Sequence, residues 1–262
     1  MALIKPGLVF SRRRFLVSGA ASLALAGCDR LSAAPSFQEI LAAGERLNYG
    51  AQRSLFSRTA LAPEFSPRDV SGTFRPNGAQ DSYNLAPEYF EHAKDNYVRW
   101  RLQVDGLVTR PASFSLAELR TMGSRTQITR HDCVEGWSCI GRWTGTPLSA
   151  VLQRVGLRPE ARFIVFHCAD EQLRYQDGEH TYYESIDLID AFHPQTILAY
   201  ELNGAALPLA NGAPLRLRVE RQLGYKMAKF IARIEAVDRF DNIRDGHGGY
   251  WEDSGYEWYA GI

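Results

Sequence analysis

Residues 129–147 read TRHDCVEGWSCIGRWTGTP and contain the cysteine on which the interpretation of the chain depends. The pattern predicts that Cys133 lies in a loop at the end of a strand, with Arg130 and His131 close by. Neighbouring positive charge favours the ionised thiolate. A thiolate is a ligand for soft transition metals. The alternatives for Cys133 are a buried, inert thiol or a short-loop disulfide with Cys139.

The first 35 residues are expected to be a targeting segment. Residues 11–16 (SRRRFL) precede an apolar run that ends at Gly27, too short to cross a bilayer but suited to a signal. They resemble a twin-arginine signal; a Sec signal is the alternative, and either predicts export to the periplasm. Residues 25–28 (LAGC) resemble a lipobox, in which an acylated Cys28 anchors the protein to the inner membrane. Cleavage after Ala34 is the alternative.

The cysteine count supports a special use for one thiol. The chain has 4 cysteines, and if Cys28 is acylated then Cys133, Cys139 and Cys168 remain. This is an odd number in an oxidising compartment, so at least one thiol has a use other than a disulfide. Cys139 is expected to be a packing residue.

The composition predicts one large domain. The chain has 262 residues, of which 45% are hydrophobic, enough to bury a full core. Lys+Arg and Asp+Glu both number 30, so no overall basic field exists to hold nucleic acid or anionic lipid. Any anion binding must therefore be local.

The fold is predicted to be α+β, with mixed sheets and short helices in a single domain over residues 36–245. An aromatic tail follows over residues 246–262. Residues 36–96 are expected to wrap the core, with a short helix near Phe37–Leu47. Alternation predicts strands at 98–104, 163–168, 197–202 and 215–220, with a turn at Asn203-Gly204 after the third. A capping box of Ser115 and Glu118 predicts a helix at 115–120, Thr146-Pro147 is expected to cap a second helix at 147–155, and a third is expected at 187–191.

Strand 215–220 places two arginines on one face. Leu215, Leu217 and Val219 face the core, so Arg216 and Arg218 share the other face. From the pattern alone, this second face would be solvated.

Three ordered stretches resemble the sulfite oxidase family, most closely its periplasmic methionine-sulfoxide reductase branch. The first is residues 129–148. The second, 198–216, contains LAYELNG, LP and NGAPLR, and the third, 224–229, is GYKMAK. The resemblance covers about residues 65–240, and three ordered signatures are more specific than one motif. It implies a sulfite-oxidase-type fold that binds molybdenum through a molybdopterin cofactor.

The resemblance implies that Cys133 is the catalytic residue that ligates molybdenum. It assigns cofactor contacts to Asn77, Cys133, Cys168, Asn211, Arg216, Met227, Ala228 and Lys229.

Each polar contact has a chemical reason. Arg216 offers a forked guanidinium to the pterin phosphate, Asn211 an amide and Lys229 a point charge. For Asn77, a turn residue before glycine is the alternative. Cys168 stands where the family often has Thr, and a buried strand cysteine is its alternative. His131 either lines the site or has a structural or solvent-facing role.

The sequence also departs from the family. Too few residues follow Val237 to form the immunoglobulin-like dimerisation domain of sulfite oxidases, so we expect a monomer. No haem motif or iron–sulfur cysteine cluster is present, so electrons are expected to pass to or from a haem-containing or quinone-linked membrane protein. The aromatic tail is expected to pack on the domain; rings that flank the site are the alternative.

The predicted function is oxygen-atom transfer, most specifically reduction of a small or protein-bound S-oxide. Sulfite oxidases place arginines just after their cysteine, whereas this chain has Val134, Glu135, Gly136 and Trp137. An ionised Glu135 that points to the pocket would repel sulfite. Alternatively, Glu135 caps the backbone and faces away while Arg142 or Arg174 binds the anion. Sulfite oxidation and a non-catalytic pterin-binding scaffold are the other functions.

Overall fold

The computed structural model describes residues 34–80, 85–171 and 181–262. The predicted export signal and lipobox fall on residues outside these ranges, apart from Ala34 and Pro35. The chain falls into two units that divide between Gln52 and Arg53. Helix α2 (Pro35–Leu55) supplies most of the described part of the first unit. It is longer than the helix expected near Phe37–Leu47, because after Pro35 at its first turn no proline interrupts the segment.

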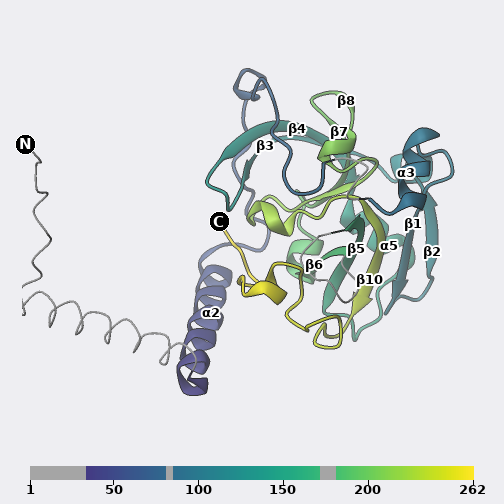
Figure 1. Ribbon diagram of the computed structural model, residues 1–262. Helices are drawn as coiled ribbons and strands as arrows, with labels where there is room; N and C mark the ends of the chain where they lie inside the picture. Colours follow the sequence, from purple (N-terminus) through teal and green to yellow (C-terminus); the bar gives the residue numbers. More distant parts are fainter. Residues whose placement is uncertain (1–33, 81–84, 172–180) are drawn as a thin grey trace, which may run out of the picture. The chain divides into compact units, whose positions relative to one another are not determined.

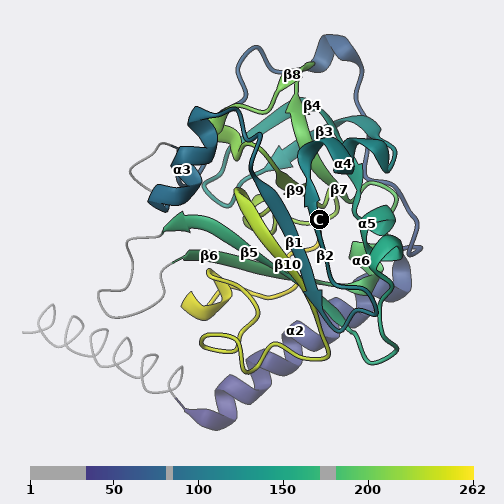
Figure 2. The ribbon, with the colours of Figure 1, turned by 90° about the vertical axis from the view of Figure 1, so that its right-hand side faces the viewer.

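The framework of the second unit is a mixed sheet, sheet I, and an antiparallel sheet, sheet II (Figures 1 and 2). Sheet I has the order β2-β1-β10-β5-β6, and β1 pairs with β10 in parallel. Sheet II has the order β3-β4-β7-β8, with β9 also paired to β7. In both views sheet II lies above sheet I. The α+β architecture of sheets with short helices that the sequence predicts is confirmed.

The strands are β1 (Arg101–Gly106), β2 (Ala112–Ser115), β3 (Arg125–Asp132), β4 (Ser138–Pro147), β5 (Phe163–Glu171), β6 (Thr181–Asp187), β7 (Ile197–Leu202), β8 (Ala205–Ala206), β9 (Arg216–Arg218) and β10 (Ile231–Val237). The other helices are α3 (Pro87–Lys94), α4 (Leu116–Thr121), α5 (Leu148–Val155) and α6 (Leu188–Ala191), with short 3-10 turns η1 (Pro67–Asp69), η3 (Leu209–Asn211), η4 (Gly224–Lys226) and η5 (Glu252–Ser254).

Most predicted elements are confirmed, with two differences. The capping box of Ser115 and Glu118 opens α4. The strand expected from Val98 begins at β1 instead, because residues 95–100 form turns and Val98 is 78% exposed. Thr146 does not cap α5; its hydroxyl donates to the carbonyl of Leu119 at 2.8 Å.

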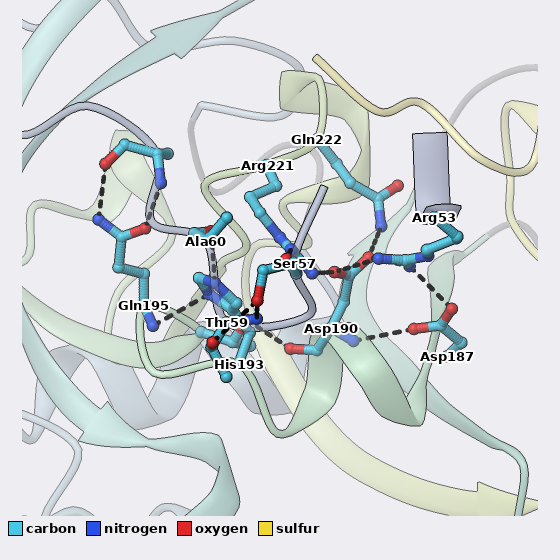
Figure 3. A network of polar contacts seen from close by, with 12 residues as sticks. Arg53, Ser57, Thr59, Ala60, Asp187, Asp190, His193, Gln195, Arg221 and Gln222 are labelled. Atoms are coloured by element: carbon cyan, nitrogen blue, oxygen red, sulfur yellow. Dashed lines mark hydrogen bonds and ion pairs between the residues drawn. The ribbon is translucent and has the colours of Figure 1, made fainter. Parts of the chain in front are cut away.

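A polar network ties the start of the second unit to α6 (Figure 3). The carboxylate of Asp190 accepts hydrogen bonds from Arg53 and, at 2.6 Å each, from Arg221 and Gln222. Arg53 also contacts Asp187 at 2.8 Å. Because Asp190 is buried, its charge depends on these donors.

No helix within the described ranges combines the length and apolar character needed to cross a membrane.

Candidate active site

One cavity of about 140 Å³ collects many of the residues expected to bind the cofactor. The loop after β3, the turn η4, the start of β6 and the C-terminal tail all contribute to it. Its walls are formed by Asn77, Gly78, Cys133, Val134, Glu135, Asp170, Tyr182, Gly224, Tyr225, Met227, Lys229, Trp251 and Tyr256.

Cys133 is the first residue after β3, in a tight hairpin loop. Its N–H donates to the carbonyl of Trp137 at 3.0 Å, and its carbonyl accepts from Gly136, which has a φ of 85°. Positive φ suits glycine, which explains its place in this loop. Cys133, Cys139 and Cys168 are all free thiols, so the alternative of a Cys133–Cys139 disulfide is not observed.

The electrostatic surroundings of Cys133 differ from the prediction. Burial raises the pKa of its thiol, partly offset by backbone N–H groups of Glu135 and Val134 and by the charge of Arg75. Arg130 instead pairs with Asp132 at 2.9 Å. The prediction that positive charge from Arg130 and His131 favours the thiolate form of Cys133 is therefore wrong.

His131 is completely buried and packs against Gly224, which lines the cavity. Its Nδ1 lies 3.1 Å from Nη1 of Arg218, so Nδ1 accepts and the ring is neutral. Burial, then the charge of Arg218, lowers the pKa of His131 well below its ordinary value. A Cβ on Gly224 would lie 2.4 Å from Nε2 of this ring, so His131 packs directly under η4. The solvent-facing alternative is wrong, and the structural role is observed.

The two arginines of β9 share one face as predicted, but that face is not solvated. Arg216 and Arg218 are both 0% exposed, and their guanidinium carbons lie 5.1 and 4.5 Å from the ring centroid of Trp143. Arg218 forms an ion pair with Glu220 at 2.6 Å. Trp143 of β4, two strands away in the same sheet, lies against both guanidinium groups, and the alternation within one strand cannot reveal such a cross-sheet neighbour.

Arg216 has a different set of partners from Arg218. It donates to the carbonyls of Asn211 at 3.1 Å and Met227 at 3.3 Å, and its Nε has no hydrogen-bond partner in the described chain. Burial and the nearby charge of Arg218 lower the pKa of Arg216 to about 9. A buried guanidinium without a carboxylate is unfavourable by itself and is suited to an anionic ligand.

Lys229 is a second buried cation and, unlike Arg216, it lines the cavity. Its ammonium donates to the carbonyls of Asn77, Ala79 and Ala210. Burial and the charge of Arg216 lower the pKa of Lys229 to about 7. Because its donors are used on carbonyls, Lys229 positions the loop of Asn77 as well as supplying charge.

The two predicted asparagines retain unused polar atoms. Oδ1 of Asn77 and Nδ2 of Asn211 are buried without a hydrogen-bond partner in the described ranges. Asn77 lines the cavity, whereas Asn211 and Arg216 are buried beside each other and are not among the residues that line it. Buried groups of this kind normally have a partner, which a polar ligand would provide.

The last three residues predicted to contact the cofactor, Met227, Ala228 and Cys168, lie in different surroundings. Met227 lines the cavity and is 3% exposed. Ala228 is buried, and its carbonyl accepts from Leu217 at 2.8 Å. Cys168 is buried in the main core and is not among the residues that line the cavity; burial raises the pKa of its thiol.

Glu135 lines the same cavity as Cys133 and is 55% exposed. Its Oε2 accepts from the indole of Trp137 at 2.9 Å and lies 3.7 Å from Arg75. It therefore reaches both the cavity and solvent. Arg142, one expected source of an anion site, does not line the cavity, and Arg174 lies outside the described residues.

Sequence reasoning missed two aromatic residues of the wall and favoured the wrong role for two others. Tyr182 and Tyr225 were not singled out, although Tyr225 belongs to a recognised motif. Trp251 and Tyr256 belong to the tail, for which packing on the domain was expected and rings that flank the site were the alternative; both side chains line the cavity, as in the alternative. The aromatic spacing of the tail was a usable signal, but its path across the site depends on tertiary contacts.

The chain belongs to the family of oxidoreductase molybdopterin-binding domains, whose family model matches residues 90–243. It is a molybdopterin-dependent oxidoreductase of the sulfite oxidase type.

Individual relatives extend this match. A putative protein-methionine-sulfoxide reductase subunit YedZ1 of Azospira oryzae is 35% identical over 249 residues, which cover 95% of this chain and 86% of the relative. The protein-methionine-sulfoxide reductase catalytic subunit MsrP of Xanthomonas axonopodis pv. citri is 40% identical over 53% of this chain, a match that covers 45% of MsrP. The sulfane dehydrogenase SoxCD of Paracoccus pantotrophus is similar in structure, with a TM-score of 0.47 and 23% identity over 53% of this chain and 38% of SoxCD.

The residues present fit a molybdopterin. The cofactor carries a phosphate and many ring donors and acceptors, and the site offers two buried cations without an ion pair in the described chain, Arg216 and Lys229. The unpartnered polar atoms of Asn77 and Asn211 are close in the fold to these cations.

Proposed function

We propose that this protein reduces a neutral S-oxide, with methionine sulfoxide in a protein as the leading substrate. The observation that carries the proposal is the carboxylate of Glu135 in the wall of the cavity that Cys133 also lines. The names of the Azospira and Xanthomonas relatives support the same substrate class.

The cofactor is held, in this proposal, by residues from several segments. Cys133 ligates molybdenum, and Arg216 binds the phosphate with Lys229 as a second charge. When bound, the cofactor supplies a two-electron centre that exchanges an oxygen atom with a substrate heteroatom. The remaining contacts are assigned to Asn77, Asn211, Cys168 and the backbone of Met227 and Ala228.

Glu135 selects against anions. Two like charges within a partly dry site repel by about 2 to 4 kcal/mol, depending on their separation. A neutral sulfoxide meets no such repulsion. Arg75, at 3.7 Å from the carboxylate, offsets part of its charge but lies outside the wall of the cavity. The same carboxylate reaches solvent, so we assign to it the passage of protons into the site.

The reaction balances as one sulfoxide, two electrons and two protons giving one thioether and one water. The electrons are expected from a haem-containing or quinone-linked membrane protein. An exported, periplasmic location, with or without a lipid on Cys28, would place the enzyme beside such a partner. We expect the enzyme to act as a monomer.

Steady-state assays test this function. Purified, molybdenum-loaded enzyme is offered methionine sulfoxide peptides and dimethyl sulfoxide with a reduced viologen donor, and separately sulfite with an electron acceptor. We expect sulfoxide turnover and weak or absent sulfite oxidation. Efficient sulfite oxidation that saturates at low concentration, without sulfoxide turnover, would overturn the substrate class. Absence of both activities in loaded enzyme would favour a pterin-binding scaffold.

A further inference from the structure

The C-terminal segment, residues 246–262, contributes two aromatic side chains to the active-site cavity. Trp251 and Tyr256 line the same cavity as Cys133. The segment begins after residue 243, where the match to the family model ends. These two side chains therefore come from a part of the chain that lies outside the match to the family model.

The rings form a contiguous aromatic surface. The rings of Trp251 and Tyr256 lie 5.3 Å apart at an interplanar angle of 32°. Tyr225 of η4 meets Tyr256 edge to face at a centroid distance of 5.3 Å. Tyr182 also lines the cavity. Rings at these distances and angles pack favourably with one another.

Buried polar contacts hold this surface in place. Lys226, the last residue of η4, is 0% exposed and donates to the carboxylates of Glu184 and Glu252. Glu252 directly follows Trp251. Breaking a buried ion pair of this type is strongly unfavourable, so η4 and the C-terminal segment are fixed to β6 and to each other.

Further hydrogen bonds fasten the segment on both sides of Tyr256. The hydroxyl of Tyr225 donates to the carbonyl of Glu257 at 2.7 Å. The N–H of Tyr250 donates to Tyr183 at 3.0 Å, and that of Leu223 donates to Ala260 at 2.9 Å. A surface held in this way is organised before a ligand arrives, which reduces the ordering entropy that binding would otherwise require.

We propose that Trp251 and Tyr256, together with Tyr225, form the subsite that binds the methyl and sulfur end of a methionine sulfoxide side chain. Aromatic rings attract polarisable sulfur and methyl groups without needing charge. Glu135 in the same cavity excludes anions, so the combined wall selects a neutral, sulfur-bearing group. This inference rests on the proposed function, since it names the substrate group that the site receives.

The test compares Trp251→Leu and Tyr256→Leu with the matched control Tyr259→Leu. Tyr259 belongs to the same segment but does not line the cavity; its ring stacks on Arg53. Tyr256 is 40% exposed, so its replacement leaves the core intact. All enzymes are purified loaded with cofactor, and their molybdenum content is measured.

Two readouts are taken with a methionine sulfoxide peptide. The KM and kcat are measured with a viologen donor, and the Kd is measured by calorimetry without any electron donor. We expect KM and Kd to rise about tenfold in both cavity variants with kcat nearly unchanged, because an aromatic contact with the bound group is lost. The KM and Kd of Trp251→Phe should stay within about threefold of the wild-type values, because this variant keeps an aromatic ring. The KM and Kd of Tyr259→Leu should equal the wild-type values.

Failure of this inference is distinct from failure of the proposed function. Wild-type turnover of the peptide with unchanged KM and Kd in both cavity variants would overturn the aromatic subsite alone. Molybdenum-loaded wild-type enzyme that neither binds nor reduces the peptide would overturn the proposed function and this inference together.

Discussion

Arg53 and Asp190 are 137 positions apart in the sequence and are joined by two hydrogen bonds, Nη1 to Oδ1 at 3.2 Å and Nη2 to Oδ2 at 2.8 Å (Figure 3). Burial alone would raise the pKa of Asp190. Hydrogen bonds and charge from Arg53 and Arg221 outweigh burial and hold this pKa below its ordinary value.

Acid should therefore destabilise the folded protein by protonating the carboxylate of Asp190. A carboxyl whose folded pKa is depressed stabilises the protein above its unfolded pKa, about 3.9, and this contribution is lost as pH falls through the folded pKa. We expect Asp190→Asn to lower the free energy of unfolding by about 3 kcal/mol at pH 7. Denaturant unfolding at pH 7 and pH 3 measures the difference in the free energy of unfolding between wild type and Asp190→Asn. This difference should be smaller at pH 3.

The control is Asp241→Asn, which removes an exposed ion pair with Arg239. Exposed pairs add little to stability, so this variant should melt like wild type. A difference between wild type and Asp190→Asn that stays constant down to pH 3 would contradict the pKa argument.

Arg216→Met should separate stability from cofactor retention. Replacing a buried, unpaired cation with an apolar side chain removes its desolvation penalty, so the cofactor-free protein should melt at the same or a higher temperature. The pterin phosphate loses its forked partner, so purified protein should contain little molybdenum. Metal analysis and thermal melts of both proteins check this. Full molybdenum content in Arg216→Met would refute the assigned role.

Gly224→Ala should disturb the floor of the cavity. The new Cβ would lie 2.4 Å from the buried ring of His131, so either η4 or the ring must move. Overpacking of this kind typically destabilises by about 1 to 3 kcal/mol. Gly72→Ala is the control, because nothing lies within 4 Å of its Cβ position. Equal melting temperatures for the two variants would contradict this prediction, because they would show that η4 accommodates the Cβ without loss of stability.

The mature N-terminus tests the targeting prediction. If residues 25–28 act as a lipobox, mass spectrometry should find a diacylated or triacylated Cys28 at the N-terminus of membrane-bound protein. A free N-terminus at Pro35 or Ser36 would instead mean a soluble exported enzyme. Either result is compatible with the cofactor site, which lies in the second unit.

Sequence alone predicted the fold class and the loop position of Cys133 because local signals agree with the tertiary structure there. The capping box of Ser115 and Glu118 and the turn at Asn203 are local, and the structure has both. The failures are tertiary in origin. Arg218 reads as solvated because alternation does not show that Trp143 covers its face.

The cavity wall was less predictable for the same reason. Trp251 and Tyr256 are held at the site by tertiary contacts, among them the buried contact of Lys226 with Glu252, that no local pattern reveals. The role of His131 was ambiguous, since its burial under η4 and its contact with Arg218 are tertiary features.

Cys133→Ser should give folded protein with little or no turnover, because a hydroxyl is a harder and more basic ligand than a thiolate. Cys139→Ser should behave as wild type, since its thiol makes only a weak contact, 3.9 Å from the carbonyl of Thr73. Sulfoxide reduction assays on both variants check this. Equal loss in both, with full recovery under reductant, would indicate a disulfide instead of a metal ligand.

X-ray absorption at the molybdenum edge tests the central claim most directly, because it counts the sulfur atoms bound to the metal. If Cys133 ligates molybdenum, metal-loaded Cys133→Ser protein should have one sulfur neighbour fewer than wild type, while Cys139→Ser protein should be unchanged. The same number of sulfur neighbours in wild type and Cys133→Ser would contradict the account.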